Sequence, residues 1–351
     1  MIFRDYKSSF LWKDTILSEN STIKNVIDNL NNSGLKISLV VNKKNKFVGT
    51  ITDGDIRRGI SEGLNLKSKI TKIINKNAIV IKKKLNKKKI TTLLNKNLIN
   101  ALPRINKYNQ VVDLHTTFDL PIEIKNRITN KVIIMAGGMG KRMMPHTKKI
   151  PKPLIRIKNK PMIEHVILNF KKFGFINFIL SLNYLGRLIK NHYKDGKKLG
   201  IKIDYIEENK RLGTAGSLSL LNSSKNENII VTNCDVISEI DYSEVLKFHN
   251  ENSADATMVV RHYEIPNPFA VIKTNGRKFI SFKEKPSRFE NINAGIYVLK
   301  TTSLKYLKYN EKIDMPDFFM KLKKKNKKVV VYPSYENWAD LGTVEMIKKL
   351  K

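Results

Sequence analysis

The stretch VIIMAGGMGKR, residues 132–142, decides how the second part of this chain is interpreted. Its first four residues are apolar, as in a buried strand, and they run directly into a loop that contains three glycines. Glycines after a parallel strand let backbone N–H groups approach phosphate oxygens closely. The stretch therefore predicts a phosphate-binding loop at the end of a strand in a parallel sheet.

Two familiar phosphate-binding patterns do not fit this loop. A Walker-type loop needs four residues between its glycines and then Gly-Lys-Ser/Thr, and the dinucleotide fingerprint needs a glycine where Met143 stands. The sequence instead reads Gly-Gly-x-Gly-x-Arg and continues to PKPL at 151–154 and KPM at 160–162. A glycine loop alone is a weak signal, but a pattern fixed across residues 137–162 is a strong one.

Apolar strands and helical segments alternate downstream of the loop. Strands are expected at 132–135, 177–182, 201–207 and 229–232, and helices at 162–173 and from Thr214 onward. This alternation predicts an α/β fold with a Rossmann-like, mostly parallel sheet that is covered on both faces.

The chain before the loop contains two copies of a small unit of about sixty residues. In the first copy we expect a helix at 22–30, strands at 37–41 and 47–51, and a helix after the segment 49–58. The second copy is weaker and begins near Ala78. Its expected elements are strands at 79–81, 101–105 and 111–114 and a helix at 90–98.

These patterns divide the chain into parts. Each copy is too small to bury a core alone, so we expect the two copies to form one paired α+β domain over residues 1–120. A polar connector is expected at 121–130, and the α/β domain at 131–351. A length of 351 residues is comfortable for two domains.

The net charge of +35, from 66 basic and 31 acidic residues, raises the question of a nucleic-acid partner. Only 12 of the basic residues are Arg, and the excess is spread over both parts of the chain rather than gathered in a patch or tail. Lys is the poorer choice for bidentate phosphate or base recognition. We therefore expect compositional drift and no nucleic-acid partner.

Cysteine and hydropathy patterns bear on the compartment. The single cysteine, Cys234, excludes an intrachain disulfide and favours a reducing environment, and it is expected to be a small buried residue rather than a nucleophile. No run of eighteen or more apolar residues predicts a membrane span, and residues 1–7 lack the order of a secretory signal. The expected location is the cytoplasm.

Residues 1–120 resemble the CBS domain pair, a regulatory module that often binds adenine nucleotides. The most specific element is the spacing of Gly49, Thr52 and Asp55. The resemblance implies that Thr52 faces a phosphate and that Asp55 accepts hydrogen bonds from ribose hydroxyls. In the second copy His115 and Phe118 stand at those places, so at most one nucleotide site looks intact. A simple helix cap by Thr52 and Asp55 is an equally open interpretation.

Residues 131–351 resemble the sugar-1-phosphate nucleotidyltransferase family. The glycine loop is followed in order by EENKRLGTAG at 207–216, VTNCD at 231–235, EKP at 284–286, NAG at 293–295 and WADLGT at 338–343. Such enzymes join a sugar-1-phosphate to the α-phosphorus of a nucleoside triphosphate and release pyrophosphate. Positioning and charge neutralisation carry this chemistry.

The resemblance assigns roles residue by residue. Arg142 and Lys152 would be catalytic, holding the triphosphate and the α-phosphate, and Asp235 with Asp340 would hold Mg²⁺. The nucleotide-binding residues would be Ala136, Gly137, Gly138, Gly140, Glu208 and Gly213. The sugar-phosphate contacts would be Ala270, Glu284, Lys285 and Asn293.

The base and sugar follow from fewer residues. Glu208 falls at the base-reading position, and an ionised carboxylate accepts the two adjacent donors of guanine but repels the acceptors of uracil, so GTP is favoured. A CBS pair ahead of a nucleotidyltransferase domain is an arrangement similar to that of the glucosamine-1-phosphate guanylyltransferases of legionaminic acid biosynthesis. This similarity implies that the acceptor is an amino sugar phosphate. Mannose-1-phosphate, a heptose phosphate and a nonenzymatic nucleotide-sugar sensor stay open. By resemblance we also expect a homodimer.

Overall fold

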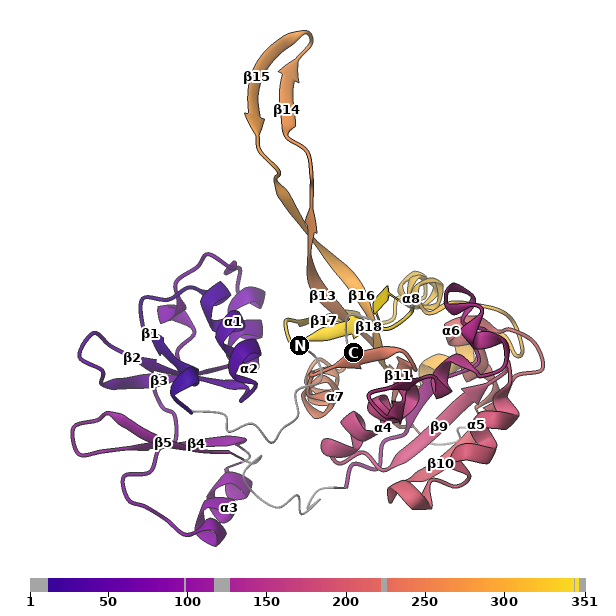
Figure 1. Ribbon diagram of the computed structural model, residues 1–351, viewed down its shortest axis with the longest axis horizontal. Coiled ribbons are helices and arrows are strands. Elements are labelled where there is room, and N and C mark those ends of the chain that lie inside the picture. The colour runs from indigo at the N-terminus through magenta and orange to yellow at the C-terminus, as the bar shows by residue number, and fades with distance from the viewer. Residues whose placement is uncertain (1–11, 98, 117–126, 222–225, 344, 347–351) are drawn as a thin grey trace. The chain divides into compact units, whose positions relative to one another are not determined.

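The computed structural model describes residues 12–97, 99–116, 127–221, 226–343 and 345–346. The chain divides into two compact units, whose described residues run over 12–116 and 127–346 (Figure 1). The predicted boundaries stay predictions, but the end of the predicted connector lies against the second unit, where the N–H of Ile128 donates to the carbonyl of Gly174 at 2.8 Å. No helix in the described ranges is long and apolar enough to span a membrane.

The first unit contains two small sheets and three α-helices in its described part. The three-stranded sheet has the order β1-β2-β3, and β4 pairs with β5. The bounds are β1 (Ile16–Ser18), α1 (Ile23–Ser33), β2 (Ile37–Val41), β3 (Phe47–Thr52), α2 (Asp53–Ser61), α3 (Lys87–Lys96), β4 (Ala101–Ile105) and β5 (Val111–Thr116), with 3-10 helices at Trp12–Thr15 and Ile70–Lys72.

The two copies in this unit share one core. Leu35 and Leu39 of the first copy are buried in the same cluster as Ala101 and Leu114 of the second. The second copy also has a smaller cluster of its own, in which Ile90 and Leu94 of α3 are buried with Leu102. The strand predicted at 79–81 is wrong, because only an isolated bridge between Ile81 and Arg104 forms there.

The second unit is built on a seven-stranded sheet with the order β10-β9-β6-β11-β16-β13-β17 (Figure 1). Neighbouring strands are parallel except where β16 lies between β11 and β13. The bounds are β6 (Val132–Met135), β9 (Asn177–Leu182), β10 (Lys202–Glu207), β11 (Asn228–Asn233), β13 (Ala256–Pro266), β16 (Ser287–Lys300) and β17 (Val329–Ser334).

Two hydrophobic cores cover the two faces of this sheet. Adjacent residues of β6 belong to different cores. Ile134 packs in one core with residues of α4 and α5, and Ile133 packs in the other with residues of α6 and α8. The prediction of a mostly parallel sheet covered on both faces is confirmed. The helices are α4 (Met162–Lys172), α5 (Gly186–Tyr193), α6 (Gly213–Gly216), α7 (Tyr242–Glu251) and α8 (Met315–Lys324), with 3-10 turns η4 (Lys141–Met143), η5 (His146–Lys148), η6 (Lys152–Leu154), η7 (Lys197–Leu199), η8 (Ser217–Leu220) and η9 (Thr301–Tyr306).

Two further two-stranded sheets lie on this body. β7 (Arg156–Ile157) pairs with β8 (Lys160–Pro161), and β12 (Val236–Ser238) pairs antiparallel with β18 (Trp338–Asp340). The second pair matters for the site, because it joins the chain just after β11 to a segment a hundred residues later.

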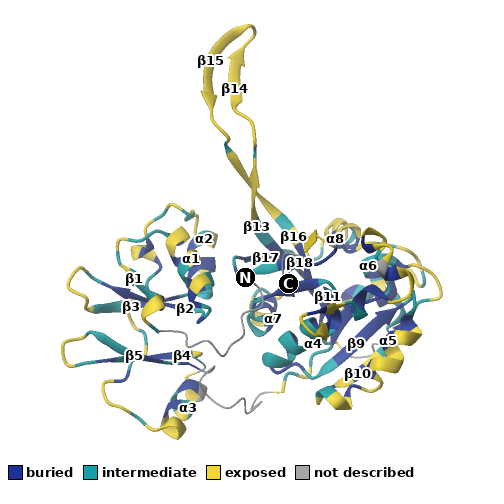
Figure 2. Ribbon diagram, viewed as in Figure 1, coloured by how far each residue is buried: buried dark blue, intermediate teal, exposed yellow. Residues whose placement is uncertain are grey.

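The strands β13 and β16 leave the body as a long ribbon that ends in β14 (Val271–Asn275) and β15 (Lys278–Lys283) (Figures 1 and 2). We call residues 263–291 the arm. All of its residues are exposed except Asn267 and Pro286, which are half-buried. The arm thus contributes nothing to the core of the body from which it projects.

Candidate active site

Four parallel strands, β6, β9, β10 and β11, end at the same edge of the sheet, and all but β9 are followed by a segment that the sequence analysis marked as functional. The N–H of Ala136, after β6, donates to Ser181 of β9 at 2.9 Å, and the N–H of Cys234, after β11, donates to Met135 at 3.3 Å. The N–H of Glu208, after β10, bonds to Leu182 at 2.8 Å. Ligands of open parallel sheets bind at this carboxyl edge.

The glycine loop packs against two other parts of this edge. A methyl group added at Gly137 would lie 3.2 Å from a carboxylate oxygen of Glu208. Gly140 has φ +62°, which suits glycine, and a methyl group there would lie 3.0 Å from the Cβ of Lys152. At Gly138, by contrast, no described atom lies within 4 Å of such a methyl group, so the loop is open there.

Lys152 is buried between Pro151 and Pro153 and forms an ion pair with Asp235. Their side chains are only 10% and 13% exposed. A charge removed from water this far requires a partner, so each group depends on the other in the substrate-free protein. The pair lies next to the glycine loop through the contact of Lys152 with Gly140.

The β12–β18 pair brings Asp340 to the same place. Val236 lies opposite Asp340, and the N–H of Leu341 donates to the carbonyl of Asp235 at 2.9 Å. Arg142 arrives from the loop: a methyl group at Gly342 would lie 2.8 Å from Asp340 Oδ1 and 3.0 Å from the Arg142 guanidinium. Arg142, Lys152, Asp235 and Asp340 therefore converge, although they are far apart in sequence.

This donor set fits a Mg²⁺ ion that is shared with phosphates. Mg²⁺ is commonly held by one or two carboxylates, with water and substrate phosphates as the other ligands. Asp235 and Asp340 supply such a pair. No cluster of three or more His, Cys, Asp or Glu side chains that could hold a metal occurs within the described ranges.

Cys234 lies beside these charged residues, but its thiol is unreactive at neutral pH. Its side chain is buried, and burial together with the neighbouring Asp235 carboxylate raises the pKa of its thiol to about 12. A thiol with such a pKa carries almost no thiolate at neutral pH. This supports the interpretation of Cys234 as a small buried residue.

Glu208 is held in place by residues that the sequence analysis did not single out. One carboxylate oxygen accepts the hydroxyl hydrogen of Ser181 at 2.6 Å, and the other accepts the N–H of Leu212 at 3.1 Å. The amide of Asn183 donates to the Glu208 carbonyl at 2.7 Å. A polar residue near the end of an otherwise apolar strand, as Ser181 is in NFILSL, was the available signal.

Gly213 has a structural role in the fold, in addition to its predicted role in nucleotide binding. Its φ is +77°, and a methyl group would lie 2.6 Å from the carbonyl of Ile313. That carbonyl accepts the N–H groups of Ala215 and Gly216, both at 3.1 Å. The helix expected from Thr214 is therefore only the four-residue α6, continued by the 3-10 turn η8.

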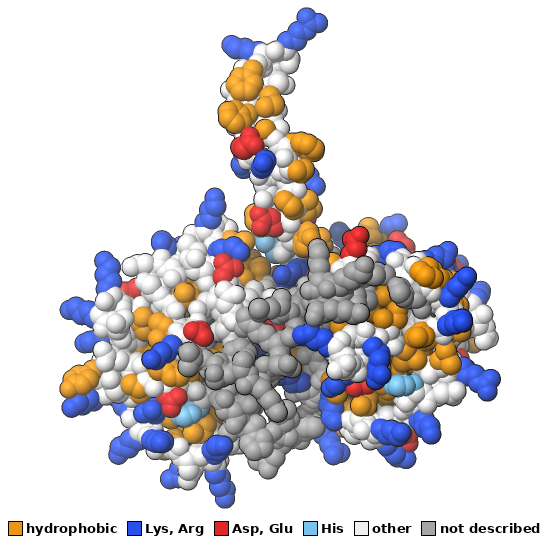
Figure 3. Space-filling view, in the orientation of Figure 1, with side chains coloured by type: hydrophobic (Ala, Val, Ile, Leu, Met, Phe, Trp, Pro, Cys, Tyr) orange, Lys and Arg blue, Asp and Glu red, His pale blue; other side chains and the backbone are white. Residues whose placement is uncertain are grey.

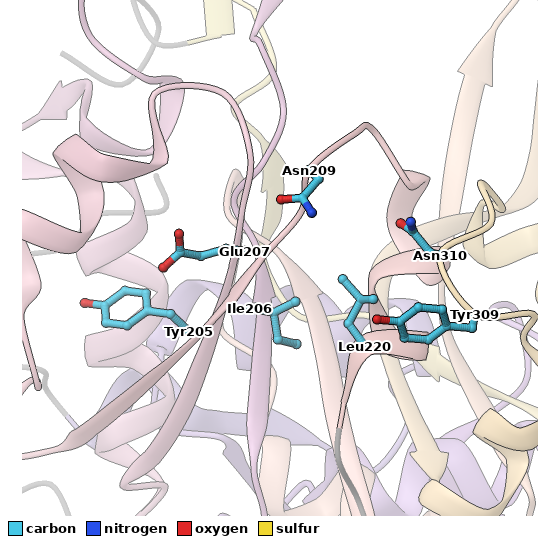
Figure 4. A pocket seen from close by; sticks show the side chains of 7 residues that line it. All are labelled: Tyr205, Ile206, Glu207, Asn209, Leu220, Tyr309 and Asn310. Atoms are coloured by element: carbon cyan, nitrogen blue, oxygen red, sulfur yellow. The ribbon is translucent and has the colours of Figure 1, made fainter.

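A shallow pocket of about 280 Å³ lies along β10, the edge strand of the sheet (Figure 4). Glu207 and Asn209 line it, together with Tyr309, and Glu207 also pairs with Lys190 of α5 at 2.5 Å. Glu208, between them, is not among the lining residues; it bonds to Ser181 instead. The pocket and the convergent charges are therefore separate features.

Of the predicted sugar contacts, Asn293 alone lies near the strand ends. Its side-chain oxygen accepts the N–H of Gly295 at 3.0 Å, and its amide donates to the Tyr297 hydroxyl at 2.7 Å. A methyl group on Gly295 would lie 3.0 Å from the side chain of Asn233, which ends β11. The NAG segment thus borders the site.

Ala270, Glu284 and Lys285 lie on the arm, so the structure does not bring them to the strand ends of their own chain. Ser287 is six residues from Asn293 along β16, which is roughly 20 Å at the usual rise of a strand. Lys285 lies further out still. Their role as sugar-phosphate contacts stays a prediction.

In the first unit, Thr52 and Asp55 bond to each other. The N–H and hydroxyl of Thr52 donate to Asp55 Oδ2 at 2.8 and 2.7 Å, and Arg58 pairs with Asp55 Oδ1 at 2.5 Å. These bonds are the ones expected if Thr52 and Asp55 cap helix α2. His115 of the second copy lies 3.7 Å from Asp113, and Phe118 lies outside the described residues.

Comparisons with known proteins agree with this geometry. The nucleotidyl transferase family matches residues 131–350, and the CBS domain matches residues 9–62. A rice (Oryza sativa subsp. japonica) protein named "Probable mannose-1-phosphate guanylyltransferase 1" is 35% identical over 222 residues, 60% of this chain and 61% of its own length. Mannose-1-phosphate guanylyltransferase 1 of Arabidopsis thaliana is 39% identical over 184 residues, 50% of this chain and 51% of its own.

These matches cover about three fifths or less of the curated relatives. Among solved structures, a Bacillus anthracis protein described as a candidate glucose-1-phosphate thymidylyltransferase, in complex with sucrose, shares the fold with a TM-score of 0.51 and 23% identity, over 63% of this chain and 94% of that one. The predicted fold class is confirmed. From its family match over residues 131–350, this chain belongs to the nucleotidyl transferase family, and it carries a CBS domain in its N-terminal part.

Proposed function

We propose that this chain transfers a guanylyl group from GTP to a sugar-1-phosphate and releases pyrophosphate. The observation that carries the proposal is the convergence of two cations and two carboxylates beside a glycine loop. Membership of the nucleotidyl transferase family supports it, as do the names of the curated relatives, which are mannose-1-phosphate guanylyltransferases.

The reaction joins two anions. A phosphate oxygen of the sugar-1-phosphate attacks the α-phosphorus of GTP, the bond from that phosphorus to the bridging oxygen breaks, and the electron pair leaves with pyrophosphate. Lys152 holds the α-phosphate and neutralises charge that develops there, and Arg142 holds the β- and γ-phosphates. The open backbone at Gly138 gives phosphate oxygens access to N–H groups.

Asp235 and Asp340 would hold a Mg²⁺ ion. The ion would neutralise negative charge on the phosphates. Because Lys152 pairs with Asp235 in the substrate-free protein, its ammonium has to turn from that carboxylate toward the α-phosphate when nucleotide and metal arrive. The Lys152–Asp235 pair thus keeps both groups in place before substrate binds.

Glu208 selects the base. Two hydrogen bonds, from Ser181 and Leu212, occupy part of its acceptor capacity, and a carboxylate has about four lone-pair sites. The remaining sites can accept the N1–H and exocyclic amine of guanine. The same bonds fix the carboxylate, so little side-chain entropy is lost when GTP binds.

The acceptor sugar has two candidates. The names of the relatives favour mannose-1-phosphate. The combination of a CBS domain with the transferase domain favours glucosamine-1-phosphate, for a bacterial surface glycan or legionaminic acid. The two sugars differ at C2, where glucosamine carries an ammonium group that a carboxylate such as Glu284 would bind and mannose carries an axial hydroxyl.

The CBS domain is proposed to bind an adenine nucleotide at Thr52 and Asp55. In the structure the Asp55 carboxylate is taken up by Thr52 and Arg58. The Arg58 side chain is 70% exposed, so it can leave Asp55 at little cost when ribose hydroxyls compete for that oxygen. Thr52→Ala should then weaken AMP binding, measured by calorimetry, without changing unregulated turnover.

A pyrophosphate-release assay tests the main proposal. Four nucleoside triphosphates are crossed with mannose-1-phosphate, glucosamine-1-phosphate and a heptose-1-phosphate, with Mg²⁺ and with or without AMP. The proposal predicts turnover with GTP and one or more of these sugars, and product identified by mass as a GDP-sugar. A nucleotide-sugar sensor would bind GDP-sugar without releasing pyrophosphate, and turnover with UTP alone would contradict the base assignment.

A further inference from the structure

The arm carries an apolar surface that nothing in its own body covers. Ile272 and Phe282 are opposite each other in the β14–β15 ladder and are 53% and 63% exposed. Phe269 and Phe279 are 73% and 59% exposed. Apolar side chains follow the length of the arm in the space-filling view (Figure 3). An isolated two-stranded hairpin is at best marginally stable in water, so this one requires a surface to pack on.

The arm is a paired ribbon that extends away from the body (Figures 1 and 2). β13 and β16 are paired from Ala256 opposite Leu299 out to Pro266 opposite Ser287, with one register shift between Met258 and Val260. In this conformation the arm does not reach the strand ends of its own chain, and its residues are exposed except for Asn267 and Pro286. A second molecule can contact the arm without any change in its conformation.

The positions of the predicted phosphate-binding cations indicate which surface the arm fits. Of the predicted phosphate-binding cations, Lys152 is paired with Asp235 and Arg142 lies beside Asp340. The third, Lys285, is on the arm. The arm has six Lys or Arg residues and three Glu, a net positive charge suited to the anionic sugar phosphate. Of these three predicted cations, Lys285 is therefore the one that lies outside the strand-end site.

We infer that the arm docks on a second copy of this chain and completes that copy's sugar-phosphate site. Resting on the proposed function, this inference assigns Lys285 and Glu284 of one protomer to the strand-end site of its partner, where Arg142, Lys152, Asp235 and Asp340 converge. The apolar side chains around Ile272 and Phe282 are buried between the two copies. The active protein is a dimer in which each site is built by two chains.

Heterodimers with complementary defects test this directly. One chain carries Lys152→Ala with an intact arm, and the other carries Lys285→Glu with an intact body; the two are co-expressed with different tags and purified through both. If the arm acts on the partner, one of the two sites is fully intact, and the heterodimer has about half of the wild-type activity per dimer. At a sugar-1-phosphate concentration well below the wild-type KM, each homodimer should have about a tenth of the wild-type activity or less.

If each arm served its own chain, both sites of the heterodimer would be defective and its activity would match the homodimers. That result overturns the inference, as does failure to recover any complex through both tags. Lys278→Glu, which reverses another charge on the arm, replaces Lys285→Glu in the control pair. That control heterodimer should also reach half activity, while its Lys278→Glu homodimer stays near wild type.

A second measurement does not depend on the reaction. Sedimentation should show wild type as a dimer and Phe282→Glu shifted toward monomer, whereas Met320→Glu, at a residue that is 55% exposed on α8, should stay dimeric. If wild type gives no GDP-sugar but sediments in this way, the proposed function fails and arm docking survives. A monomeric wild type would overturn the docking itself.

Discussion

The strand ends and the arm belong to one unit and carry sequence motifs of similar strength, yet the structure treats them differently. At the strand ends, Arg142, Lys152, Asp235 and Asp340 meet, because parallel strands finish at one edge and the β12–β18 pair joins two distant segments. On the arm, Glu284 and Lys285 remain exposed. A residue at a strand end is positioned by its own sheet, whereas one on a hairpin is positioned by what the hairpin packs against.

The largest expected effect is the loss of turnover when a strand-end residue is replaced. Lys152→Ala removes the partner of the buried Asp235 carboxylate, so circular dichroism first checks that the variant is folded. Its turnover should fall by roughly 10²–10³, the usual cost of removing one group that stabilises transition-state charge. Initial rates of pyrophosphate release measure it. Lys149→Ala, at an exposed lysine three residues away, is the matched control and should remain active. Near-normal turnover in Lys152→Ala would reject its catalytic role.

The next effect concerns the arm. Lys285→Glu should raise the KM for the sugar-1-phosphate about tenfold or more, because a negative charge replaces the cation that faces the phosphate, and should leave the KM for GTP nearly unchanged. Steady-state kinetics with each substrate varied separately show the split. An equal rise in both KM values, or the same effect in Lys278→Glu, would argue against a sugar-phosphate contact.

The third effect sharpens the assignment of the base. Glu208→Gln replaces an acceptor oxygen by a donor, so the preference for GTP over UTP should fall by about tenfold or more, in line with about 1.5–3 kcal/mol for a hydrogen bond to a charged group. Competition assays with both nucleotides measure the ratio. Glu207→Gln, which removes only the exposed pair with Lys190, should keep the preference. An unchanged ratio in Glu208→Gln would remove the base-reading role.

The last prediction concerns the stability of the body rather than its function. His249 is fully buried, its Nε2 has no hydrogen-bond partner among the described residues, and burial, with repulsion from Lys300, lowers its pKa from 6.5 to about 4. The unfolded chain binds a proton at the ordinary pKa and the folded protein does not. Stability should therefore fall as the pH drops from about 6.5 to about 4, by roughly 3 kcal/mol at most.

Urea unfolding at pH 7 and pH 4.5 measures this fall. His249→Gln removes the titrating ring, so the variant should lose less stability than wild type over the same pH interval. Equal losses in the two proteins would mean that other groups carry the acid sensitivity of the body.

Much of the architecture could be predicted locally. Val132–Met135 and Asn177–Leu182 are strands with the predicted bounds, because continuous apolar runs between turn residues favour buried strands. The strand expected at 79–81 did not form, and the helix expected from Thr214 is only the four-residue α6, continued by η8. At the helix, the carbonyl of Ile313 accepts hydrogen bonds from the N–H groups of Ala215 and Gly216. This is a tertiary contact that cannot be predicted from the local sequence.

The order of the residues alone determined the family pattern, the buried strands and the types of charge that a phosphate-transfer site needs, because these depend on side-chain chemistry and short-range periodicity. Only the tertiary structure decided which of those charges meet. Lys152 and Asp235 are 83 residues apart and form one buried pair, while Lys285, in an equally clear motif, lies exposed on the arm, away from that pair. The reason is that long-range pairing depends on how strands order themselves in a sheet, which sequence spacing does not encode.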